Sequence, residues 1–93
     1  MVVATIIIDK DLLNNDITYD KFLIKCVENH INDLIQHNGY VYLNQIYEYL
    51  FVGWNPDNDN VCIKKKKELR TYVTFEVFVI MDGSLLLLVH DYN

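Results

Sequence analysis

Residues 70–91 read RTYVTFEVFVIMDGSLLLLVHD. Apolar and polar residues alternate in its first half, which predicts a strand over residues 70–81 with one apolar face, Val73, Phe75, Val77, Val79 and Met81, and one more polar face, Tyr72, Thr74 and Glu76. The Asp82-Gly83 pair is typical of a two-residue type I′ turn. Residues 84–91 are then expected to return as the partner strand, so the end of the chain is predicted to be a β-hairpin.

Two further segments carry strong periodic signals. Residues 2–8, VVATIII, are apolar and β-branched, which predicts a strand buried on both sides. Residues 19–37 show the helical spacing, with Thr18 as the expected N-cap and Gly39 as the stop. The apolar stripe of this helix consists of Leu23, Ile24, Val27, Ile31, Leu34 and Ile35.

Between the long helix and the hairpin the predicted elements are short. Residues 40–43 read as an extended segment, and Asn44 is expected to cap a short helix over residues 45–51 that ends at Gly53. A loop over residues 54–60 and a short strand over residues 60–64 follow. The expectation is one α+β domain over residues 1–93, with a long and a short helix packed on a small antiparallel sheet that ends in the hairpin.

The charge is unevenly distributed over the 93 residues, whose net charge is −5. Residues 1–63 contain three lysines and nine acidic residues, a net charge of −6. Such a surface disfavours direct nucleic-acid binding and favours a basic protein partner, although solubility alone also explains it. The Lys64–Lys67 run is interpreted as a solvated edge that prevents association between sheets.

Targeting signals are weak. No apolar run reaches the roughly 18 residues of a membrane-spanning helix, and Asp9 interrupts the first apolar segment too early for a signal peptide. The expectation is a soluble, cytoplasmic protein without a membrane partner.

The long helix carries the sharpest cluster of metal-ligating residue types. Cys26, His30, Asp33 and His37 fall on one flank of its apolar stripe, because residues four apart stack one turn above another. A thiolate and an imidazole suit zinc, and Cys62 and His90 can complete a two-Cys, two-His structural site if the sheet packs on the helix. The alternative is that the cysteines are small buried hydrophobes and the helix-flank histidines are half-buried, hydrogen-bonded residues.

Aromatic and acidic residues predict a surface for a protein partner. Tyrosines cluster between residues 40 and 49, and Tyr49 and Trp54 are the expected exposed anchors, since Tyr and Trp bury much area at low entropic cost. The acidic residues expected beside these anchors are Asp33, Glu48, Asp57 and Asp59. Most of the other aromatic residues of this cluster, which extends to Phe51, are expected to pack in the core. Without a Gly-rich phosphate loop or a G-x-S-x-G motif, the chain is predicted to lack enzymatic activity.

Three motifs carry a family resemblance. Residues 39–50, GYVYLNQIYEYL, then Gly53-Trp54-Asn55 and residues 82–87, DGSLLL, resemble small proteins encoded by phages and prophages of low-GC Gram-positive bacteria. The resemblance covers about half of the chain and transfers no catalytic residues, and His90 departs from the pattern. What it implies is a context: small acidic phage proteins of this kind include type II-A anti-CRISPR proteins.

Three hypotheses follow for the function. The resemblance implies a phage-encoded inhibitor of bacterial defence, which binds the host's type II CRISPR RNA-guided nuclease stoichiometrically in the host cytoplasm and blocks DNA loading or recognition. Lysine- and arginine-lined channels of such a nuclease supply complementary charge. The alternative is a small phage structural, assembly or regulatory binding protein. A metal-dependent enzyme is the third and weakest hypothesis.

Overall fold

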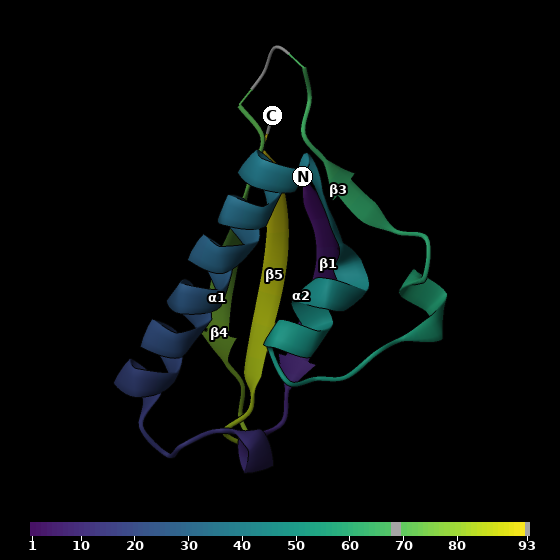
Figure 1. Cartoon of the computed structure of the whole chain (residues 1–93). Coiled ribbons are helices and arrows are strands. Elements are labelled where there is room, and N and C mark those ends of the chain that lie inside the picture. Colours follow the sequence, from purple (N-terminus) through teal and green to yellow (C-terminus); the bar gives the residue numbers. More distant parts are fainter. Residues whose placement is uncertain (68–69, 93) are drawn as a thin grey trace.

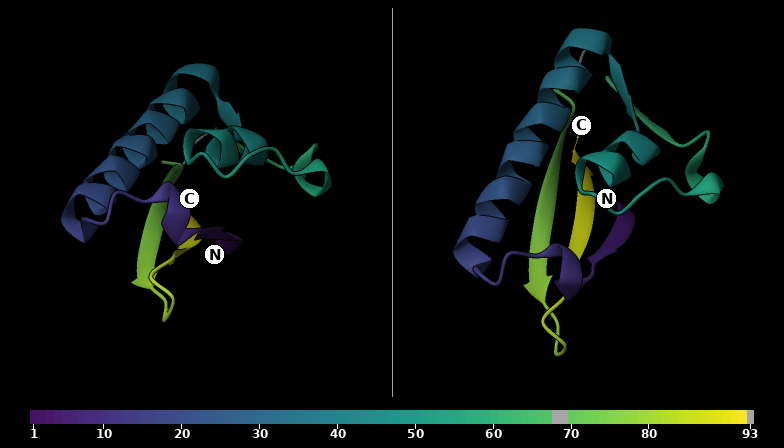
Figure 2. Two further views of the ribbon diagram at one scale, coloured as in Figure 1. Left: turned by 90° about the horizontal axis from the view of Figure 1, so that it is seen from below. Right: turned by 60° about the horizontal axis from the view of Figure 1, so that its bottom comes forward.

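A computed structural model describes residues 1–67 and 70–92 of the chain. Its main sheet has three antiparallel strands in the order β1-β5-β4 (Figure 1), formed by Val2–Ile8, Leu85–Tyr92 and Tyr72–Val79 respectively. Helix α1 (Ile17–Asn38) and helix α2 (Leu43–Tyr49) lie on one side of this sheet, and the end-on view in Figure 2 shows no ribbon on the other side. The predicted α+β class, with its long helix, short helix and terminal hairpin, is confirmed.

The remaining elements are short. Strands β2 (Tyr40–Tyr42) and β3 (Cys62–Lys64) pair antiparallel in a separate two-stranded sheet beside α2. Two 3₁₀ turns, η1 (Lys10–Leu12) and η2 (Pro56–Asn58), connect the larger elements. Within the described residues, no helix is long and apolar enough to cross a membrane.

One hydrophobic core lies between α1, α2 and the inner face of the main sheet. Alternate residues of a strand point to opposite sides, so this face consists of every second residue. Ile31 and Ile35 of α1 are fully buried against it, and the sheet contributes Ile6, Ile8, Val73, Leu85, Leu87 and Val89. The prediction that residues 2–8 are buried on both sides is wrong: β1 is an edge strand with Thr5 and Ile7 exposed, and β5 is the central strand.

Helix α1 also occupies the free edge of β4 through a polar ladder. The Asn32 side chain donates to the Val73 carbonyl at 2.9 Å and accepts from the Val73 amide at 2.7 Å. Glu28 accepts from the Phe75 amide at 2.9 Å, and Gln36 donates to the Thr71 carbonyl at 2.9 Å. Four helical residues rise about 6 Å and two strand residues about 6.7 Å, so the side chains of α1 bond the strand's edge with almost matching spacing.

The helix boundaries differ from the predictions by a few residues, for identifiable reasons. Asp16 rather than Thr18 caps α1, and its carboxylate accepts from the Tyr19 amide at 3.1 Å. Helix α2 begins at Leu43, so Asn44 is a helical residue instead of the predicted cap. The buried Asn44 amide accepts from the Asn55 amide and donates to the Asn55 carbonyl, each at 3.0 Å, and thereby fixes the loop after α2.

The hairpin is present, but its turn is not the predicted two-residue type I′. That turn needs positive φ at both central residues, and only Gly83 has it, with φ of +92°. The Gly83 amide donates to the Ile80 carbonyl, and the Ile80 amide donates to the Ser84 carbonyl. Residues 81–83 therefore form a three-residue loop, a type I turn followed by a left-handed glycine.

Candidate functional site

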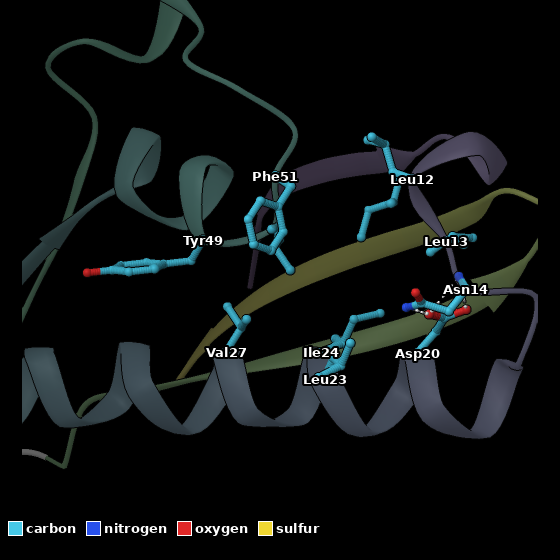
Figure 3. A pocket seen from close by; sticks show the side chains of 11 residues that line it. Leu12, Leu13, Asn14, Asp20, Leu23, Ile24, Val27, Tyr49 and Phe51 are labelled. Carbon is cyan, nitrogen blue, oxygen red and sulfur yellow. Dashed lines mark hydrogen bonds between the residues drawn. The ribbon is translucent and has the colours of Figure 1, made fainter.

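An apolar pocket of about 70 Å³ lies where α1, η1 and the end of α2 meet (Figure 3). Side chains from η1 and α1 face the end of α2 across it, as the figure shows. Its apolar lining consists of Ile8, Leu12, Leu13, Leu23, Ile24, Val27, Tyr49, Leu50 and Phe51. This set, which we call the α1–α2 groove, places exposed apolar residues directly beside the core.

One end of the groove is polar and firmly held. Asp20 in the first turns of α1 is only 5% exposed. Its carboxylate accepts from the Asn14 side chain at 2.8 Å and from the Asn14 backbone amide at 3.2 Å. A buried carboxylate without hydrogen bonds would be costly, and these donors offset that cost while tying the segment after η1 to α1. The groove therefore has one anchored wall.

Phe51 forms the opposite wall in an unusual backbone conformation. Helix α2 ends in a Schellman motif, in which the Phe51 amide donates to the Glu48 carbonyl and the Val52 amide to the Tyr47 carbonyl, each at 3.0 Å. The motif requires a left-handed residue after the C-cap, usually glycine. Here that residue is Phe51, with φ of +61°. The left-handed conformation costs a residue with a Cβ atom about 1–2 kcal/mol.

The Phe51 ring is hardly buried, so packing in the core does not offset the cost of its backbone conformation. It is 82% exposed, although it lines the groove. An exposed aromatic ring on a strained backbone is better explained by binding than by folding, because strained positions cluster at ligand-contacting sites. Leu12, at 54% exposure, lies across the groove from it. Together they offer a partner an apolar anchor point.

The structure brings only some of the predicted partner-binding residues to this groove. Tyr49 lines it, and the neighbouring Glu48 is exposed. Asp33 is exposed on α1, one turn beyond His30, whose ring packs edge-on against the ring of Tyr49 at 4.7 Å between centroids. The other three predicted residues are exposed in the loop around η2 and do not line the groove: Trp54, Asp57 and Asp59.

The predicted zinc ligands are not brought together. Cys26 and His30 lie on the same flank of α1, as expected, but Cys62 lies on β3, in the separate small sheet. His90 lies on β5 with its side chain on the face of the main sheet away from α1, where its Nε2 is 3.1 Å from Glu76 Oε1. Across residues 1–67 and 70–92, no three His, Cys, Asp or Glu side chains are close enough to share an ion. The structure therefore does not bring these four residues to one site.

His37 and Cys26 of α1 have other surroundings. The His37 Nδ1 donates to the Asp33 carbonyl at 2.8 Å, which satisfies it within its own helix. Cys26 is exposed and free. Neither residue lines the α1–α2 groove.

Phe51 is a site residue that the sequence prediction missed. The short helix is predicted to end at Gly53, because glycine is common after a C-cap. The chain instead turns two residues earlier, and no residue type at position 51 announces a left-handed conformation.

No protein-family model, curated protein or solved structure matches this chain.

Proposed function

We propose that this protein acts by binding, without catalysis, to a larger basic protein, and that its target is a type II CRISPR RNA-guided nuclease. The observation that carries the binding role is Phe51, held at an energetic cost with its ring exposed over the α1–α2 groove. Central aromatic residues beside an apolar pocket are typical of binding hot spots.

The charge supports a basic partner. The groove lies within residues 1–63, whose net charge is −6. Asp11 and Glu48 are exposed and adjoin the lining residues Leu12 and Tyr49 in the sequence. An apolar centre with an acidic rim suits a lysine- and arginine-lined surface, since the rim speeds encounter and the centre slows release.

The choice of target rests on the resemblance to small phage proteins given by residues 39–50, 53–55 and 82–87. A nuclease of this type holds its guide–target heteroduplex in a positively charged channel. An acidic protein bound at that channel competes with DNA. The nuclease is then inhibited in proportion to the number of inhibitor molecules bound, and no turnover is required.

The test is a titration of the nuclease, loaded with guide RNA, with the full-length protein before DNA is added. We expect DNA cleavage to stop near one protein per nuclease and the affinity to fall as salt rises. Phe51→Ala is the test variant and Phe22→Ala the control, because Phe22 is 61% exposed on α1 but does not line the groove. Full cleavage at a tenfold excess of protein would refute the choice of target.

A further inference from the structure

Within residues 1–67 and 70–92, one face of the main sheet is covered by no helix (Figure 2). The rows of paired residues define this outer face, because residues paired across antiparallel strands point to the same side. Leu86 pairs with Ile7 on one side and with Phe78 on the other, and Leu88 pairs with Thr5 and Glu76. The remaining outer-face residues are Val2, Tyr72, Thr74, His90 and Tyr92.

The row nearest the hairpin turn is wholly apolar and partly open to solvent. Ile7 is 56% exposed and Phe78 44%, with Leu86 half-buried between them. Monomeric proteins rarely leave an apolar sheet face of this kind uncovered. We propose that the outer face packs against the same face of a second copy of this chain, in a two-fold symmetric, face-to-face dimer.

Charge favours a second copy over the basic partner of the α1–α2 groove. The chain carries a net charge of −5, so two copies repel each other over most of their surface. Among the outer-face residues named above, Glu76 is the one acidic residue, and its Oε1 lies 3.1 Å from His90 Nε2. This face therefore lets two acidic molecules approach with little repulsion, whereas it offers a basic protein a single carboxylate.

The size of the face is sufficient for a dimer. Three strands about 4.8 Å apart and eight residues of about 3.3 Å each span a flat area of about 380 Å². Two such faces cover about 760 Å² of flat area, to which the relief of their side chains adds, so the interface lies toward the small end of protein–protein interfaces. We therefore expect a dimer of modest affinity.

Pairing through the sheet edges is a poorer arrangement for the same two molecules. The edge of β4 is occupied by Asn32, Glu28 and Gln36 of α1. Helix α2 lies over β1 in Figures 1 and 2, so strand pairing at about 4.8 Å would bring α2 closer to its copy than the 8–10 Å that packed helices need. The open face meets neither obstacle.

The test is sedimentation equilibrium of the full chain over a concentration series up to about 200 µM. We expect a mass near twice the 11.0 kDa of one chain at the upper end. Ile7→Lys and Phe78→Glu are each expected to weaken the dimer at least tenfold, while Phe22→Lys, which adds a charge to the exposed side of α1, leaves it intact. Circular dichroism of each variant verifies that it is folded.

A monomer at every concentration would overturn the proposal. So would a dimer that survives both outer-face variants, because it would place the interface elsewhere. The result is independent of the proposed target, since the outer face and the α1–α2 groove lie on opposite sides of the sheet and Phe51→Ala is expected to leave the dimer unchanged.

Discussion

Replacing Phe51 by glycine separates the effect of this residue on the stability of the fold from its effect on affinity for a partner. Glycine removes the roughly 1–2 kcal/mol cost of the left-handed conformation but adds about 0.4–1 kcal/mol of chain entropy to the unfolded state. The ring is 82% exposed, so its loss removes little burial, at most about 0.5 kcal/mol of the ~3 kcal/mol of a fully buried side chain. The net expectation is a stability gain of about 0.5 kcal/mol.

For a chain of 93 residues this gain corresponds to a rise in Tm of about 2–4 °C, measurable by calorimetry. The matched variant Phe51→Ala also loses the ring but keeps the positive φ, so it is expected to melt below Phe51→Gly. If Phe51 is a binding anchor, both variants lose about 2 kcal/mol of affinity for the target, roughly 30-fold in Kd.

The two variants also define what would refute this reasoning. A Phe51→Gly protein that melts below the wild type would show that the ring is needed for folding and that its backbone conformation is not strained. Unchanged affinity in both variants would show that the exposed ring is not an anchor.

Three other perturbations have defined outcomes. Asn32→Asp keeps an acceptor for the Val73 amide but loses the donor to the Val73 carbonyl. Chemical denaturation should therefore show that the free energy of unfolding falls by about 1–3 kcal/mol. Asn29→Asp, which makes the same charge change at an exposed position of α1, should be nearly neutral. The backbone amide and hydroxyl of Ser84 hold the pKa of Asp82 below its usual 3.8. The ionised carboxylate therefore stabilises the hairpin above that pH, and this contribution disappears as the pH falls below it. The Tm of Asp82→Asn should depend less on pH between 5 and 2.5 than that of the wild type, and equal dependence would contradict the assignment. Because Cys26 and His30 lie apart from Cys62 and His90, adding a chelator should leave the Tm unchanged, and loss of one zinc per chain together with stability would show that these residues do meet.

Hydrophobic periodicity was sufficient to predict the main elements. The strand over residues 2–8 was predicted with the observed bounds, and the long helix within two residues at its start and one at its end. Alternation over residues 70–81 likewise identified β4. These signals are local, because each element buries one face and the spacing of apolar residues reports it.

The errors in the sequence predictions have two causes: neighbouring residues that can both cap a helix, and a strand whose two faces are equally apolar. Asp16 and Thr18 are both good caps, and the structure uses the one whose carboxylate reaches the Tyr19 amide. The run Leu85–Val89 is apolar on both sides, so its sequence cannot say which residues face the helix. That single parity puts Leu87 in the core and His90 on the outer face, which separates His90 from Cys26, the residue predicted to share an ion with it.

The candidate site was predicted only in part for a related reason. Tyr49 follows from its aromatic character and its place near the end of a helix. Phe51 depends on where α2 ends, and that is decided by the Schellman hydrogen bonds and not by the identity of residue 51. A strained residue breaks the local rules on which sequence analysis depends.

The most direct test of the central claim is hydrogen–deuterium exchange of the protein alone and in complex with the guide-loaded nuclease. Binding is expected to slow exchange in the segments that line the α1–α2 groove, residues 12–14, 23–27 and 49–51, while β4 and β5 keep the rates of the free protein. Protection confined to the outer face of the sheet or to β2 and β3, with the groove unchanged, would contradict it.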